Sequence, residues 1–233
     1  MLPECIASIY GRIHKVLSEK KVPKVLLNCT GLSERRIRVA EKELGIRLPE
    51  DVRDFYKISN GWPRLEIIPD QNIGFMLPLA QSRKREMVET VHGVWEVMND
   101  VIPYARTEID DIWLKPKGPI ERTWWRPSWI PLFDNNQGDH VLIDMNPPKR
   151  GVVGQLIDYE RLDGPKRIYA KSFRAFLDRF ANDLERDLYI TEPGISTVVV
   201  IKKSVRRKGQ AREKEQLRKE QVRNSSNKKD DGE

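Results

Sequence analysis

The sequence has few of the features that mark secreted, membrane or metal-binding proteins. Its two cysteines, Cys5 and Cys29, have the spacing of neither a disulfide framework nor a cysteine-based zinc site. No apolar run approaches the ~18 residues that a membrane span needs, and the first residues lack a basic stretch followed by an apolar one. We therefore expect reduced thiols, no signal peptide, and a location in the cytoplasm, or in the nucleus if the source is eukaryotic.

Motifs for catalysis and for cofactor binding are also scarce. No G-x-G-x-x-G or G-x-x-x-x-G-K-[ST] loop occurs, and His14, His92 and His140 do not have the spacing of metal ligands. Residues 134–139 lack the distal glutamate of a calcium loop, and turn chemistry accounts for their Asn and Gly. Asp139 and Asp144 would suit a hydrolase as paired carboxylates, but nothing supplies a matched nucleophile or base. The sequence predicts a binding protein without metal, cofactor or small-molecule substrate, not an enzyme.

The net charge of +7 comes almost wholly from the C-terminal tail. Residues 202–233 hold twelve Lys or Arg and six Asp or Glu, which leaves residues 1–201 nearly neutral. The folded part therefore gives no indication of nucleic-acid binding. The densest basic run is Lys202, Lys203, Arg206, Arg207 and Lys208. It is interpreted as part of a solvated, disordered tail, with nuclear targeting and contact with nucleic acid or an acidic membrane as alternatives.

Apolar residues at helical spacing dominate the N-terminal half of the chain. Ser33 is a suitable N-cap and Gly45 a suitable stop for one helix, and Pro49 suits the first turn of the next. Proline and glycine in residues 100–123 favour a loop there. Helices are expected over residues 4–20, 33–44, 49–58 and 84–99.

From residue 128 the pattern changes to short strands between tight turns. The turn signals are residues 135–138, 146–148 and 164–165. Connections this short cannot form parallel crossovers, so the strands predict an antiparallel meander. A closing helix follows Ser172. Strands are expected over residues 65–68, 73–79, 129–133, 140–145, 152–159 and 166–170. The fold class is therefore α+β, with N-terminal helices, a central antiparallel β-meander and a closing C-terminal helix.

The same signals divide the chain into regions. We expect an N-terminal helical extension, a main domain with an insertion at residues 100–123, an edge strand rich in β-branched residues, and a low-complexity basic tail. Their boundaries are residues 1–30, 31–190, 191–201 and 202–233.

Three segments resemble the SUKH superfamily, whose members have Smi/Knr-type domains. They are GLSERRIRVAEKELGIRLPEDVRDFYKISNGW at 31–62, WWRPSWIPLFDNNQGDHVLIDMNPPKRGVVGQLIDY at 124–159, and AKSFRAFLDRF at 170–180. The resemblance covers roughly residues 30–185 and is most specific in the central segment. It implies a protein-binding module: bacterial members are immunity proteins that neutralise toxins, fungal members such as the yeast cell-wall assembly regulator are regulatory scaffolds, and no common catalytic residues come with it.

Candidate contact residues are the aromatic and acidic side chains near the turns. Tryptophan is enriched at binding hot spots, and strand alternation would expose one of Trp124 and Trp125. Trp62 follows a tight turn that would hold it exposed. Core packing and turn anchoring are the alternatives for all of them. The candidates are Trp62, Trp124, Trp125, Trp129, Asp134 and Asp139.

Two functions follow from the resemblance and one from the tail. Toxin immunity is slightly preferred, although a nuclease inhibitor needs an acidic surface that the nearly neutral residues 1–201 do not guarantee. The alternative is a regulatory scaffold of a eukaryotic, fungal cell, which the low-complexity tail favours. The third hypothesis is contact of the tail with nucleic acid. Another protein, a toxin or a signalling or cell-wall protein, is the expected partner in the first two.

Overall fold

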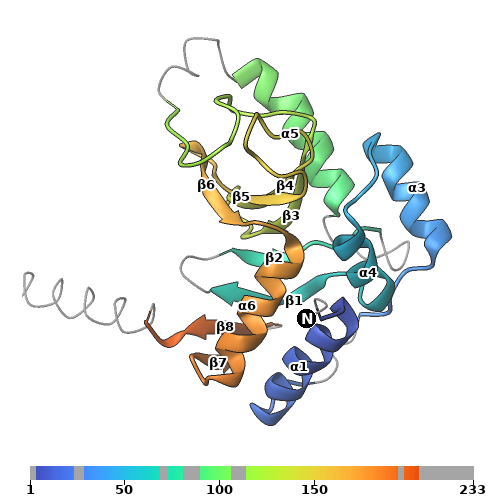
Figure 1. Ribbon diagram of the computed structural model, residues 1–233, viewed down its shortest axis with the longest axis vertical. Coiled ribbons are helices and arrows are strands. Elements are labelled where there is room, and N and C mark those ends of the chain that lie inside the picture. Colours follow the sequence, from blue (N-terminus) through green and yellow to red (C-terminus); the bar gives the residue numbers. More distant parts are fainter. Residues whose placement is uncertain are drawn as a thin grey trace, which may run out of the picture.

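A mixed eight-stranded sheet runs through the protein (Figure 1). The computed structural model describes residues 4–23, 29–68, 73–80, 90–105, 114–193 and 197–204. The strand order is β6-β5-β4-β3-β2-β1-β8-β7, and all pairings are antiparallel except that of β1 with β8. The strands are β1 (Trp62–Ile68), β2 (Gly74–Met76), β3 (Trp129–Asp134), β4 (His140–Asp144), β5 (Gln155–Glu160), β6 (Gly164–Ala170), β7 (Tyr189–Pro193) and β8 (Val198–Lys202). The predicted α+β class is confirmed.

Local signals place the helix ends where the sequence indicates them. The Ser33 hydroxyl accepts a hydrogen bond from the Arg36 amide, and Gly45 ends the helix with a φ of 67°. The hydroxyl of Ser172 accepts from the Ala175 amide at 3.1 Å. The described helices are α1 (Ile6–Glu19), α3 (Glu34–Leu44), α4 (Glu50–Ile58), α5 (Val91–Ala105) and α6 (Phe173–Glu185).

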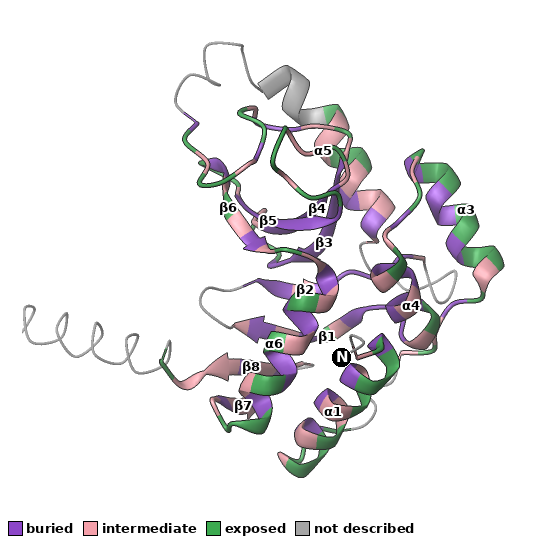
Figure 2. Ribbon diagram, in the orientation of Figure 1, coloured by how far each residue is buried: buried purple, intermediate pink, exposed green. Residues whose placement is uncertain are grey.

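The meander of β3, β4, β5 and β6 is confirmed, and its two faces pack against different helices. Val141 and Ile143 of β4 lie in the main core, which they share with apolar residues of α1, α4 and α6. Leu142, between them, points to the opposite face, where a second cluster packs against α5. Strands β3, β4 and β5 are consequently buried along almost their whole length (Figure 2). The second cluster consists of Ile120, Trp125, Trp129, Leu142, Ile157 and Tyr159.

Helix α5 differs from its predicted bounds. It begins at Val91 and continues through Pro103 to Ala105, although residues 100–123 were expected to form a loop. Proline removes one helical hydrogen bond, but packing of α5 against β3 outweighs that local preference. The first part of the predicted helix, residues 84–89, lies outside the described residues.

The segment from Leu114 to Ser128 is irregular, as expected, and lies along the outer edge of β6. The Lys117 amide donates to the Lys166 carbonyl at 2.7 Å, and the Ile168 amide donates to the Lys117 carbonyl at 3.3 Å. This pairing covers part of the sheet edge that β6 would otherwise expose.

The C-terminal strands extend the sheet at its other end. Strand β8 lies between β1 and β7, parallel to β1, so it is an interior strand. The edge strand is β7, and only its last three residues fall within the edge strand expected at 191–201. Four residues of α1, namely Ile6, Ile9, Ile13 and Leu17, lie in the main core. The N-terminal extension and the C-terminal strands therefore pack with the predicted domain.

Candidate protein-interaction surface

Two of the candidate tryptophans are core residues. Trp62, in β1, is fully buried and packs edge-to-face on Phe55 with ring centroids 4.9 Å apart. Trp129, in β3, is also fully buried. Burying an indole removes a large apolar surface from water, which explains both positions. The expectation that Trp62 is exposed is therefore wrong, and neither side chain is accessible to a partner.

Trp124 and Trp125 are 6% and 9% exposed, so both are buried and the expectation that one of them is exposed is wrong. The indole nitrogen of Trp125 donates to the side-chain oxygen of Asn99 at 2.9 Å, and its ring meets those of Trp129 and Tyr159 edge-to-face. Trp125 thus ties α5 to the sheet. Trp124 packs against Gly164, where a φ of 68° and a Cβ position 3.0 Å from the indole both require glycine.

Asp134 and Asp139 shape the turn between β3 and β4. The Asp134 carboxylate accepts from the Asn136 amide. One oxygen of Asp139 accepts from the Arg161 amide and the other from the Asn135 side-chain amide, both at 2.9 Å. These are turn-forming hydrogen bonds of the kind that Asp and Asn supply in hairpins.

His140 lies beside Asp134 at the base of this turn. Its Nδ1 is 3.4 Å from Oδ2 of Asp134. Burial of the imidazole lowers the pKa of His140, although the charges of Asp134 and Asp139 act in the opposite direction. Burial therefore favours the neutral form of His140. Within the described residues, no three His, Cys, Asp or Glu side chains are grouped to hold a metal ion.

The two lysines at the start of the predicted basic run belong to the fold. Nζ of Lys202 lies 2.7 Å from Oδ2 of Asp183 on α6 and over the Tyr189 ring. Lys203 forms an ion pair with Asp187. Both cations are thus at least partly neutralised by acidic partners. Arg206, Arg207 and Lys208 lie outside the described residues.

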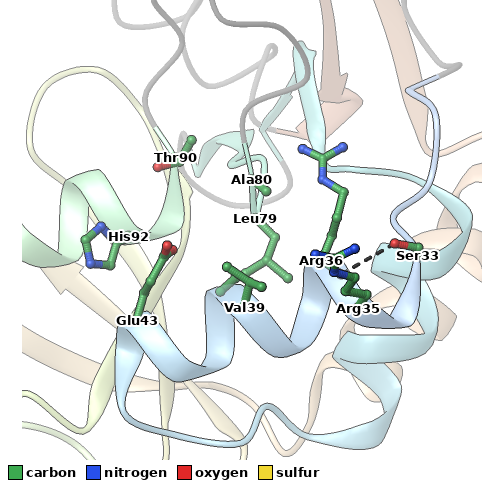
Figure 3. A pocket seen from close by; sticks show the side chains of 10 residues that line it. Ser33, Arg35, Arg36, Val39, Glu43, Leu79, Ala80, Thr90 and His92 are labelled. Atoms are coloured by element: carbon green, nitrogen blue, oxygen red, sulfur yellow. Dashed lines mark hydrogen bonds between the residues drawn. The ribbon is translucent and has the colours of Figure 1, made fainter.

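A groove of about 630 Å³ lies between α3 and the start of α5 (Figure 3). Apolar side chains line its middle, with Val39 on α3 facing Leu79 and Ala80. Val39 is 50% exposed although it is a large aliphatic residue. Arg35 and Arg36 line one end of the groove, and Glu43 and His92 line the other.

Two acidic side chains of α3 form ion pairs with α4. Glu34 and Glu41 both pair with Arg53 of α4, whose side chain is only 5% exposed. Glu34 also pairs with Arg38 of α3 itself, at 3.2 Å. Arg35, Arg36, Arg38 and Lys42 are exposed, with Glu43 as the remaining acidic residue. The outer face of α3 is consequently basic.

A second groove, of about 410 Å³, lies on the other side of α5. It is lined by Val94, Val97 and Met98 of α5 and by Asp134 and His140 of the β3–β4 hairpin. Val97 is 59% exposed. Each of the two grooves beside α5 thus has an exposed valine among its lining residues.

Sequence reasoning did not find these grooves. One signal was available: Val39 lies outside the apolar stripe of Ile37, Ala40 and Leu44, so a helix packed through that stripe exposes it. The facing positions, Leu79 and Ala80, come from a different part of the chain and only the fold brings them near.

Comparison with known proteins identifies the family of the chain. Residues 31–179 match the family described as "SMI1 / KNR4 family (SUKH-1)". The chain belongs to this family. The resemblance that the sequence indicated is confirmed, and the matched residues include α3, α4, β1, β2 and the whole meander.

Relatives of this SMI1/KNR4 family chain include fungal proteins. It is 36% identical over 178 residues to "Cell wall assembly regulator SMI1" of Saccharomyces cerevisiae, across 66% of this chain and 35% of that protein. It is 25% identical over 198 residues to "Cell wall biosynthesis/cell cycle regulator smi1" of Schizosaccharomyces pombe, across 82% and 38%. The "Glucan synthesis regulatory protein" of Neurospora crassa is 33% identical over 69 residues, across 30% of this chain and 13% of that protein. The chain spans little more than a third of the first two relatives.

Proposed function

We propose that this SMI1/KNR4 family protein is a non-enzymatic, protein-binding regulatory scaffold that acts in fungal cell-wall assembly. The observation that carries the proposal is the family membership, because its relatives are named as regulators of cell-wall assembly, cell-wall biosynthesis and glucan synthesis. The two grooves beside α5 supply surfaces on which another protein can bind. We keep the cytoplasm as its expected location. Within the described part of the chain, no helix has both the length and the apolarity to cross a bilayer.

The contacts of the two candidate carboxylates favour a binding role over catalysis. Asp144 accepts hydrogen bonds from the Asn146 amide and the Gln155 side chain. Asp139 accepts from the Arg161 amide and from the Asn135 side chain, both at 2.9 Å. These groups, which a hydrolase would need as acid and base, are engaged in holding the meander together.

Toxin immunity, which the sequence slightly favoured, is no longer the preferred function. The relatives reported above are named as regulators. The outer face of α3 is basic, whereas an inhibitor of a nuclease needs an acidic surface. Contact of the tail with nucleic acid stays a prediction for Arg206, Arg207 and Lys208.

Affinity purification tests the proposal. The tagged full chain is incubated with lysate of a fungal cell, and bound proteins are identified by mass spectrometry against an unrelated tagged protein of similar size and charge. We expect specific recovery of cell-wall or signalling proteins. Recovery of one stoichiometric toxin-like protein, or of nothing beyond the control, contradicts the scaffold function.

A further inference from the structure

We infer that the groove between α3 and α5 binds an acidic segment of a partner protein, which places an aliphatic side chain against Val39. The inference rests on the proposed protein-binding function and adds the surface and the chemistry of the partner.

The apolar middle of the groove requires an apolar group. Val39 is half exposed to water and faces Leu79 and Ala80 (Figure 3), and Ala40 also lines the groove. Covering apolar surface of this kind contributes about 25 cal/mol per Å² of area removed from water. An aliphatic side chain of a partner, inserted between Val39 and Leu79, has the matching chemistry.

The charge of the groove predicts which residues of the partner lie beside its aliphatic side chain. Arg35 and Arg36 lie at one end, whereas Glu34 and Glu41 pair with Arg53 of α4. Carboxylates on the partner would complement the positive charge at the arginine end of the groove. Glu43 at the other end disfavours acidic residues there. The acidic residues of the segment therefore lie on one side of its aliphatic anchor.

A polyanion with phosphate groups fits the groove less well than a protein segment. Its middle is lined by four aliphatic side chains, which offer no donor to phosphate: Val39, Ala40, Leu79 and Ala80. The carboxylate of Glu43 would repel a phosphate chain that ran the length of the groove. We therefore assign the groove to an acidic protein segment.

Selection from a random library of displayed 12-residue peptides on the immobilised full chain tests this assignment. We expect enriched peptides to combine Asp or Glu with Leu, Ile, Val or Met. In fluorescence anisotropy, the best peptide should bind at least about tenfold more weakly to Val39→Asp and to Arg35→Glu/Arg36→Glu. Acidic residues near a helix N-terminus are favourable, so the double variant should fold. Its thermal unfolding is measured alongside.

Matched controls separate the groove from general surface effects. Val153→Asp changes a valine that is 61% exposed elsewhere. Arg64→Glu/Lys171→Glu makes the same change in net charge at exposed positions outside the groove. Both controls should bind the peptide within about twofold of the unchanged chain. Equal losses in groove and control variants overturn the inference.

Three further results also overturn it. The first is no enrichment of peptides, or enrichment of basic or uncharged peptides. The second is peptide binding that both groove variants leave intact. The third is tight binding of a 20-nucleotide single-stranded DNA that Arg35→Glu/Arg36→Glu abolishes while Val39→Asp does not, which would assign the arginines to phosphate. If Val39→Asp still recovers regulatory partners from lysate, the scaffold function stands and only the groove assignment falls.

Discussion

The side-chain amide of Gln155 donates a hydrogen bond to the carboxylate of Asp144 at 3.1 Å, and both residues are buried. The same nitrogen donates to the carbonyl of Pro119 at 2.9 Å, and the Gln155 oxygen accepts from the Val152 amide at 3.1 Å. One glutamine thus joins β4, β5, the turn between them and the segment that covers the edge of β6. Burial raises the pKa of Asp144, and the hydrogen bond from Gln155 acts against that rise.

Replacing Gln155 should therefore destabilise the meander. Gln155→Leu leaves the buried Asp144 carboxylate and the Pro119 carbonyl without this donor, and the expected loss is about 1–3 kcal/mol in the free energy of unfolding. Urea denaturation measures it. Gln137→Leu, at an exposed turn position, is the control and should change stability by less than about 0.5 kcal/mol. Similar losses in the two variants would contradict the role assigned to Gln155.

The ion pairs of Arg53 make a second prediction. Its guanidinium contacts Glu41, which is itself buried and whose other oxygen accepts from the Leu48 amide at 2.8 Å. Arg53→Met leaves a buried carboxylate without its cation, at a cost of about 3 kcal/mol in unfolding free energy. Adding Glu41→Gln removes that charge and keeps an acceptor for Leu48. The double variant should recover about half of the unfolding free energy that Arg53→Met loses. If the effects of the two single substitutions simply add, Arg53 and Glu41 are not coupled and the prediction is wrong.

The parts of the fold that the sequence predicted are those that local residues determine. Ser33 and Ser172 cap the starts of helices and Gly45 ends one, all by contacts within a few residues, and Gly138 belongs to a turn that joins adjacent strands. The pairing of β8 with β1 joins residues more than a hundred positions apart, and periodicity carries no information on such pairing.

The candidate site was predicted less well, for a related reason. Residue type alone predicted tryptophan and aspartate as contact residues, but an indole packs well in a core as well as at a binding surface. Trp62 and Trp129 are buried, and Asp139 is occupied in its turn. The grooves depend on which side of α3 and α5 is covered, and only tertiary packing decides that.

The buried His140 predicts a dependence of stability on pH. Its pKa is lowered in the folded protein, so below about pH 6.5 the unfolded chain binds a proton that the folded chain resists. Stability should fall with decreasing pH from 7.5 to 5, by at most about 1.4 kcal/mol per pH unit from this group. His140→Gln cannot take up that proton. Urea denaturation across this range should show a shallower pH slope in the variant, and equal slopes would contradict the prediction.

Truncation tests where the folded unit ends. Strand β8 pairs with β1 on one side and β7 on the other, and Val198 and Val200 lie in the main core. A chain that ends at Ser204 retains all of these contacts and should unfold within about 2 °C of the full chain. A chain that ends at Ile195 loses β8, which leaves β1 and β7 unpaired along one edge and opens the core.

We expect that shorter chain to unfold at least about 10 °C lower or to aggregate, because an unpaired apolar strand edge templates association. Thermal unfolding followed by circular dichroism, with size-exclusion chromatography, measures both effects. Val200→Ala in the full chain is the matched control: it keeps the strand, removes only buried methyl groups, and should cost less than deletion of β8. If the chain ending at Ile195 is as stable as the full chain, the C-terminal strands are an addition to the domain and not part of its core.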